Sequence, residues 1–339
     1  MFQLILVKND GKKSYDITPL VGSVTWDSNL SLMAAMEFEL LWTDMPRFFP
    51  KNPCDLGDVV ILSKDTKEVY RGIVVTEGRS GRESIKYTVY DYAWYLGKSK
   101  SVYQFNKMPA SQAITKILND FGMLIGNVPT MGTLIDNIYL EKSPAEIIED
   151  IYKRHERATG KRYNIEMRQG KIFIEDMKDL VIKGTFRLAG NLGKRDVMSN
   201  PLGADRTRSI ENMRNRVKIL IERNGEDKGK PKYEVAASAQ DKESITKYGL
   251  LEDTYKIDAE DAAKAREVSR ILLRRLSRIQ ETNSIKLMGD VEFKAGRLLD
   301  VTEPVTGMNG RYMILTAKHT VSNQIHVMEL ELVLPEEVK

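Results

Sequence analysis

Apolar and polar residues alternate along the first hundred residues with the period of a β-strand. From Met36 to Leu40 every second residue is apolar and the residues between them are glutamates, which predicts a strand with one buried face. Turn residues separate this stretch from further apolar runs. The pattern predicts a small antiparallel barrel or sandwich over residues 1–99, with later strands at 59–62, 70–76 and 85–92.

Between residues 100 and 182 the apolar period changes to that of a helix. After Pro109, apolar side chains recur at helical spacing. A second helix is expected to begin at Ser143, which is followed by Pro144 at the first helical position. Two short strands joined by a turn at 169–170 follow. The pattern predicts a compact α/β insert over 100–182.

The remaining segment, 183–339, is predicted to form a second antiparallel barrel. Residues 189–209 are rich in Gly, Asn, Asp and Arg and indicate a linker or mobile loop, and 224–230 indicate an exposed turn. A long helix is expected over 259–280, with Asp258 as its N-cap. One face of this helix is apolar and needs a sheet to cover it, which the alternating strands that follow it can supply. The apolar positions are Ala262, Ala265, Val268, Leu272, Leu276 and Ile279.

Beside this apolar stripe, arginines recur every four residues along the same helix. Three interpretations fit them: a solvated face paired with acids such as Glu267, a subunit interface in which arginine meets a neighbour's carboxylates, and the wall of a DNA conduit. The subunit interface is the candidate site that we carry forward. Its residues are Arg266, Arg270, Arg274 and Arg278.

The two strand-rich regions share an order of parts. Leu56–Asp58 leads into a strand, a turn and a long hairpin that ends at Tyr92, and Ala295–Arg297 leads into the same series, which ends at Leu334. Duplication of one barrel and a chance likeness of two strand series both fit this pattern. If the barrel is duplicated, a trimer would present six similar barrels in a ring, which would match a six-fold tube.

Composition narrows the class of protein. Hydrophobic residues make up 42% and charged residues 29% of 339 residues, which is typical of a globular protein with two or three domains. The net charge of +4 is spread over interleaved basic and acidic residues, so binding of nucleic acid by bulk charge is weakly supported. We expect no signal peptide, membrane helix or internal disulfide, since the apolar runs are short and Cys54 is the single cysteine.

Five short sequences, together with the order of the predicted parts, point to a known family. They are DLGD at 55–58, VYRGIV at 69–74, YTVYDYAWYL at 87–96, IENMRNRV at 210–217 and KYGLL at 247–251. In these sequences the chain resembles the XkdQ/YqbQ family of phage tail proteins, which are relatives of the baseplate hub and late-control proteins of contractile tails. The order of barrel, α/β insert, loop, long helix and final strands fits this family over nearly the whole chain.

The resemblance implies an α+β, mainly β fold with two tail-tube-like antiparallel β-barrels around the α/β insert. It implies a structural baseplate hub of a phage or phage-like contractile tail, a homotrimer that joins the hexameric tail tube to the trimeric spike around a central channel. Tape-measure and baseplate wedge proteins are further implied partners, and DNA passes only as transient cargo. No cofactor, metal, small-molecule ligand or catalytic residue is implied. The expected location is the baseplate of a virion tail or bacteriocin particle assembled in the host cytoplasm.

Enzymatic alternatives find little support in the residues. His155, His319 and His326 form no HExxH pair, although the last two flank a hairpin and could meet across it. Cys54 has no nucleophile motif around it. A second alternative to the hub, which is not an enzyme, is a secreted injection-system spike module related to VgrG. The main alternative is an enzyme, a tail-associated peptidoglycan hydrolase, because such an enzyme needs only two carboxylates. The candidate carboxylates, which also suit a helix N-terminus, are Glu141, Glu146, Glu149 and Asp150.

Overall fold

The described part of the chain forms two compact units. The first combines Met1–Asp205 with Ser284–Pro335, and the second is Arg206–Asn283. The structure is a computed structural model. It describes residues 1–43, 50–80, 84–185, 201–223, 232–257, 259–303 and 306–335.

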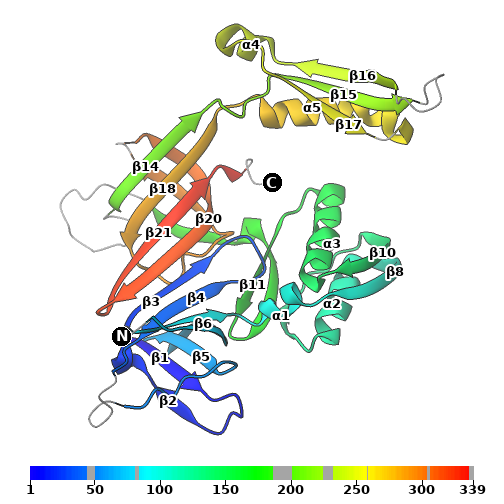
Figure 1. The fold of residues 1–339 in the computed structure, drawn as a ribbon. Helices are drawn as coiled ribbons and strands as arrows, with labels where there is room; N and C mark the ends of the chain where they lie inside the picture. Colours follow the sequence, from blue (N-terminus) through cyan, green and yellow to red (C-terminus); the bar gives the residue numbers. More distant parts are fainter. Residues whose placement is uncertain are drawn as a thin grey trace. The chain divides into compact units, whose positions relative to one another are not determined.

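The first strand group contains the N-terminal strands of the first unit (Figure 1). The predicted alternation at Met36, Phe38 and Leu40 is confirmed, because these side chains are at most 1% exposed in the core. A short 3-10 helix, η1 (Thr18–Leu20), links two of the strands. The strands are β1 (Phe2–Val7), β2 (Ser14–Asp16), β3 (Val21–Ser28), β4 (Ala35–Leu40), β5 (Val59–Lys64), β6 (Lys67–Gly78) and β7 (Ile85–Tyr90).

The second strand group comes from the C-terminal part of the chain and joins the first in one sheet. Strand β20 pairs antiparallel with β3, so the strand order runs β14-β18-β21-β20-β3-β4-β7-β6-β5-β1-β2, and β13 and β19 lie off this path next to β20. The predicted α+β, mainly β fold class is confirmed. The strands of the two predicted barrels form two groups within this one sheet, and among the described residues the pairing is antiparallel except between β13 and β19. The strands are β13 (Val181–Thr185), β14 (Pro201–Ser209), β18 (Gln280–Met288), β19 (Leu298–Glu303), β20 (Met308–Ser322) and β21 (Ile325–Val333).

Both strand groups contain a three-stranded meander that begins with the same glycine turn. The amide of Gly57 donates to the Val74 carbonyl at 2.8 Å, and the amide of Gly296 donates to the Ile314 carbonyl at 2.9 Å. In return, the amide of Val74 donates to the Asp58 carbonyl at 2.8 Å, and the amide of Ile314 donates to the Arg297 carbonyl at 2.9 Å. Both glycines have positive φ angles, +83° and +79°. The predicted internal repeat therefore has a matching local geometry in β5–β6–β7 and β19–β20–β21.

The α/β insert lies between β7 and β13 and has its own apolar core. Helix α3 begins at Ser143 as predicted, with a reciprocal capping box between Ser143 and Glu146 and Pro144 in the first turn. Helices α2 and α3 pack together against the two small sheets. The insert consists of α1 (Ala93–Lys98), β8 (Ser101–Pro109), α2 (Ala110–Asp120), β9 (Leu124–Asn127), β10 (Leu134–Lys142), α3 (Pro144–Thr159), β11 (Tyr163–Arg168), β12 (Lys171–Asp176) and η2 (Met177–Asp179).

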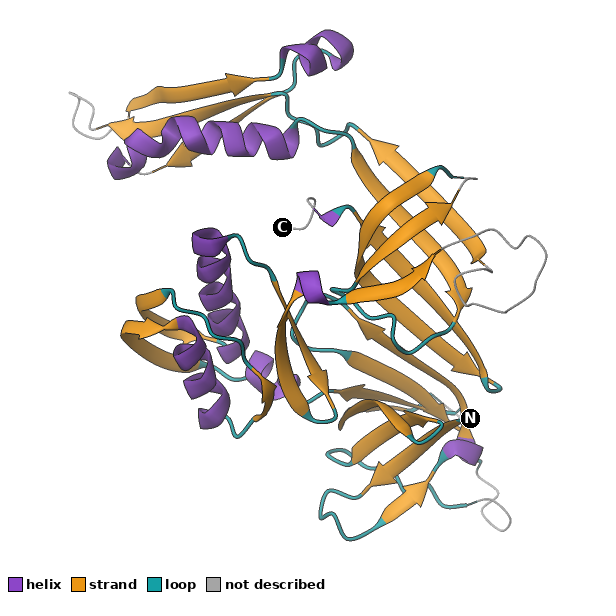
Figure 2. Ribbon diagram, turned by 180° about the vertical axis from the view of Figure 1, so that it is seen from behind, coloured by secondary structure: helices purple, strands orange, loops and turns teal. Residues whose placement is uncertain are grey.

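The second unit is a three-stranded sheet with a helix across one face (Figure 2). Val217 and Ile219 of the central strand are fully buried under the apolar face of α5. The strand order is β16-β15-β17, with β15 antiparallel to β16 and parallel to β17. The elements are β15 (Arg216–Arg223), β16 (Lys232–Gln240), α4 (Lys242–Tyr248), β17 (Glu252–Ile257), η4 (Ala259–Lys264) and α5 (Ala265–Leu276).

Three details of the sequence prediction for the C-terminal segment are wrong. The long helix covers 265–276 rather than 259–280, because residues 259–264 form the 3-10 helix η4 and Gln280 already begins β18. It packs on β15 and β16, which precede it, rather than on the strands that follow it. Residues 201–209 form β14 instead of a linker, because β18 supplies a pairing partner. Asp258, 189–200 and 224–230 lie outside the described residues, and the boundaries at 99/100 and 182/183 stay predictions.

Candidate assembly surfaces and the sheet joint

The two strand groups meet at a joint formed by β20 and β3. Residues 317–322 of β20 pair with residues 23–28 of β3 in continuous antiparallel register. The turn after β20 extends this pairing to β1, because the side-chain amide of Gln324 mimics a backbone peptide. Its Oε1 accepts from the Phe2 amide at 2.8 Å and its Nε2 donates to the Phe2 carbonyl at 3.2 Å. The joint therefore links three strands of the two groups.

A buried histidine pair occupies the centre of this joint. His319 Nε2 lies 2.8 Å from the Phe293 carbonyl and must donate to it, since a carbonyl oxygen only accepts. His319 Nδ1 then accepts from His326 Nε2 at 3.0 Å. The meeting of these two histidines across the hairpin is thus confirmed, but neither lies on the surface, since they are 1% and 6% exposed. Burial lowers the pKa of His319 to about 4 and that of His326 to about 3.

Aromatic rings enclose this pair. The indole of Trp26 in β3 stacks on His319 with a ring separation of 4.8 Å and an interplanar angle of 3°. Phe2 of β1 meets His326 edge-on at 5.1 Å. Gly289 lies so close to His326 that an added Cβ would come within 2.0 Å of the ring. These contacts fix both rings between strands from the two groups.

A small cavity of about 60 Å³ lies next to the joint and is bounded by both strand groups and the insert. Trp26 and Asp91 line it from the first group, Asn164 and Glu166 from β11, and Lys294 from the segment before β19. Burial raises the pKa of Asp91 to about 7 although its carboxylate accepts from the amides of residues 34 and 93. Burial also lowers the pKa of Lys294. Burial thus disfavours the charged forms of both Asp91 and Lys294 at this cavity.

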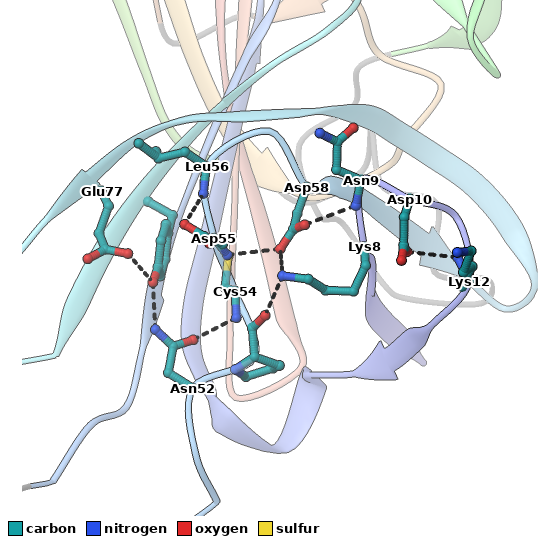
Figure 3. A network of polar contacts seen from close by, with 12 residues as sticks. Lys8, Asn9, Asp10, Lys12, Asn52, Cys54, Asp55, Leu56, Asp58 and Glu77 are labelled. Atoms are coloured by element: carbon teal, nitrogen blue, oxygen red, sulfur yellow. Dashed lines mark hydrogen bonds and ion pairs between the residues drawn. The ribbon is translucent and has the colours of Figure 1, made fainter.

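The sequence DLGD at 55–58 forms a turn fixed by one buried carboxylate (Figure 3). Asp58 is 1% exposed and accepts from the amides of Asn9 at 3.1 Å and Asp55 at 2.9 Å. The ammonium of Lys8 binds the same carboxylate at 2.5 Å, and this contact raises the lysine pKa. The nearby thiol of Cys54 is buried, which raises its pKa to about 12 and makes it a poor nucleophile. This motif therefore has a structural role.

The predicted arginine row lies on the face of α5 that points away from its sheet. Arg266, Arg270 and Arg274 are exposed, and Arg278 lies just beyond the helix, half-buried. Ile271 on the same helix is 54% exposed. Residues 206–283 contain 18 Lys and Arg against 14 Asp and Glu, whereas the rest of the chain has 34 of each. The structure thus places Arg266, Arg270 and Arg274 on one exposed face of α5 and leaves Arg278 outside this face.

The carboxylates considered for hydrolysis have structural contacts near α3. Glu146 completes the capping box with Ser143. Glu149 pairs with Lys153 at 2.6 Å one turn later. Asp150 accepts from the Tyr139 hydroxyl at 2.6 Å and pairs with Arg154. Glu141 is exposed in β10 with a φ of +54°. Capping and ion pairs account for three of these four residues without a catalytic role.

An exposed apolar face on the insert was missed by the sequence prediction. Strands β8 and β10 form a two-stranded sheet whose inner residues, such as Phe105 and Tyr139, are buried. The opposite face carries four large aliphatic side chains that are 57–66% exposed. Apolar residues at both odd and even positions of 134–140 were the available signal, since they indicate a strand that is covered on both faces. The four residues are Val102, Leu134, Ile138 and Leu140.

Comparison with known proteins identifies the family. A family model described as YQBQ-like matches residues 24–333. The chain belongs to the YQBQ-like family. The family predicted from the residues is thereby confirmed. Two YQBQ-like relatives from Bacillus subtilis (strain 168), "Uncharacterized protein YqbQ" and "Phage-like element PBSX protein XkdQ", are each 24% identical to this chain, over 282 and 281 residues. These matches cover 82% of this chain and 81% of each relative.

A solved structure shares the fold of this YQBQ-like chain. The prophage MuSo2 43 kDa tail protein from Shewanella oneidensis superposes with a TM-score of 0.71 at 16% identity, over 99% of this chain and 100% of that one.

Within the described residues of the YQBQ-like chain, no three His, Cys, Asp or Glu side chains are grouped to hold a metal ion. None of the described helices is both long enough and apolar enough to span a membrane.

Proposed function

We propose that this chain is a structural protein of a phage-type tail and acts as a baseplate hub. Family membership and the shared fold support a tail protein, since relatives of both kinds carry phage or tail names. The observation that carries the hub role is the repeated meander with its matching glycine turns at Gly57 and Gly296. Two similar strand groups per chain would give a homotrimer six similar groups, the number that a hexameric tube requires.

In this proposal the hub joins the hexameric tail tube to the trimeric spike and leaves a central channel. Tape-measure and baseplate wedge proteins are its other partners, and DNA crosses the channel only as cargo. The particle is a virion tail or a bacteriocin. The three parts predicted from the sequence, 1–99, 100–182 and 183–339, remain the proposed domains of this hub.

The arginine row of α5 is proposed as a subunit interface. Arg266, Arg270 and Arg274 are exposed beside Ile271, and a cluster of arginines around one apolar side chain is typical of protein interfaces. Arginine is suited to bind the carboxylates of a neighbour in a bidentate manner. The apolar face of β8 and β10 carries four large aliphatic side chains that are 57–66% exposed, and it is a further surface available to a partner.

Electron microscopy of the purified protein mixed with its tail tube and spike proteins tests the hub role. We expect particles in which three copies form a ring with six strand groups, bound to the tube on one side and the spike on the other. Binding to neither protein would contradict the proposal. A wall-lysis assay on the same sample tests the peptidoglycan hydrolase alternative, which requires activity that disappears when Glu149 and Asp150 are both replaced by alanine.

A further inference from the structure

The joint between the strand groups contains two titratable side chains at a place where apolar side chains alone could fill the core. His319 and His326 share one hydrogen bond of 3.0 Å, and His319 donates its remaining proton to the Phe293 carbonyl. This bond needs a neutral His319, because only then is Nδ1 free to accept, whereas a proton on His326 Nδ1 would leave the bond in place and add a buried charge. Each ring is also packed against an aromatic ring of the first strand group, Trp26 or Phe2.

The charged side chains that change the pKa of the two rings are all positive. Lys294, in the segment before β19, acts on His319, and Lys64, at the end of β5, acts on His326. The strands β1 and β3 contribute Phe2 and Trp26 at this place, which carry no charge. Among the described residues, no carboxylate raises the pKa of either ring. A proton added to the pair would therefore meet like charges and no counter-ion.

We propose that the histidine pair is an acid-sensitive lock on the joint, which opens when either ring takes up a proton. Protonation of His319 at Nδ1 would place two N–H donors face to face and break the bond to His326. The new charge would be buried against Trp26 and close to Lys294. The hairpin β20–β21 would then separate from β3 and β1, and the clamp of Gln324 on Phe2 would be lost with it.

The direction of the pH effect follows from the pKa of each histidine in the closed joint compared with its pKa when the ring is exposed. A free histidine has a pKa of about 6.5, and burial lowers the pKa of both rings far below this value. The open joint therefore binds protons that the closed joint excludes, so opening becomes easier as the pH falls below about 6.5. Each histidine can raise the opening constant by up to about tenfold per pH unit.

Hydrogen exchange tests this inference on the full chain. We expect the protection factors of amides in 317–322 and 23–28 to fall by at least about tenfold between pH 6.5 and pH 5.5. In the double variant His319→Gln and His326→Gln the fall should be less than about threefold. The protection factors already correct for the intrinsic pH dependence of exchange. Only the change with pH is compared, so a variant that is less stable at neutral pH still gives a valid result.

Two controls separate the joint from general acid unfolding. His155 is also buried, in α3, where it bonds Thr133 at 2.7 Å, so His155→Gln should leave the acid response of the joint intact. Amides of β15 in the second unit should keep their protection over the same pH range. Equal protection of the joint at both pH values in the natural chain, or an undiminished fall in the double variant, would overturn the proposal. The tail role does not depend on this result.

Discussion

At the scale of single residues, Asp58 is expected to contribute the most stability in the loop before β5. Its buried carboxylate binds Lys8 and accepts from two backbone amides. Asp58→Ala leaves these donors buried and unsatisfied, so we expect the free energy of unfolding to fall by about 3 kcal/mol. Chemical denaturation measures the change. Asp10→Ala removes an exposed carboxylate that accepts a single amide from Lys12, and should cost less than about 1 kcal/mol. Equal losses would contradict this account.

Asp91 gives a pH dependence of the opposite sign to that of the histidine pair. Its pKa in the folded chain is raised to about 7, against about 3.9 in an unfolded chain. Its contribution to stability is therefore complete below about pH 4 and is lost as the pH rises through 7. We expect Asp91→Asn to gain roughly 2 kcal/mol relative to the natural chain between pH 5 and pH 8, measured by urea denaturation. A constant difference across this range would show that the carboxyl titrates normally.

Residue-level prediction from sequence succeeded where spacing along one hairpin decides the contact. The pairing of His319 with His326 follows from their places on either side of a turn. The burial of the pair could not be predicted, because it depends on Trp26 and Phe2, which are about 300 residues away in the sequence. The roles of Asp58 and Asp91 were missed for the same reason, since nothing local distinguishes a buried aspartate from an exposed one.

At the scale of elements, the two glycine turns provide a matched pair for mutation. Gly57→Ala and Gly296→Ala both place a Cβ on a residue with positive φ, which should cost about 1–2 kcal/mol. At Gly57 the nearest atom to the new Cβ is 3.4 Å away, whereas at Gly296 the Asn164 side chain is only 2.2 Å away. We expect Gly296→Ala to lower the thermal unfolding midpoint by several degrees more. A larger effect at Gly57 would refute the described packing.

Element-level prediction was limited by the choice of packing partner. The apolar pattern correctly located several strands of both groups, such as β4 and β21, and the helices α2 and α3 of the insert, but it missed β14. The helix α5 was also found, but the sheet that it covers was assigned to the wrong strands, because Val217 and Ile219 show the same alternation as the later strands. Local sequence gives the face that must be buried, and only the tertiary fold decides what buries it.

At the scale of the whole molecule, the arginine row provides a test of subunit contact. Replacing Arg270 and Arg274 by glutamate reverses charge on the exposed face of α5 without touching its apolar face. We expect the trimer to dissociate at a protein concentration at least about tenfold higher than that of the natural chain, as sedimentation velocity would measure. Lys242→Glu with Lys247→Glu on α4 makes the same charge change elsewhere in the second unit and should have little effect. Identical dissociation of both variants would remove α5 from the interface.

The absolute mass of the purified chain in solution tests the hub account most directly. The account requires three chains, because only a trimer of two similar strand groups gives the six-fold arrangement that a tail tube needs. Light scattering over a range of concentrations should give a mass of three times the 38.6 kDa of one chain. A stable dimer or tetramer would contradict the account, and so would a chain that stays monomeric even when its tube and spike proteins are bound.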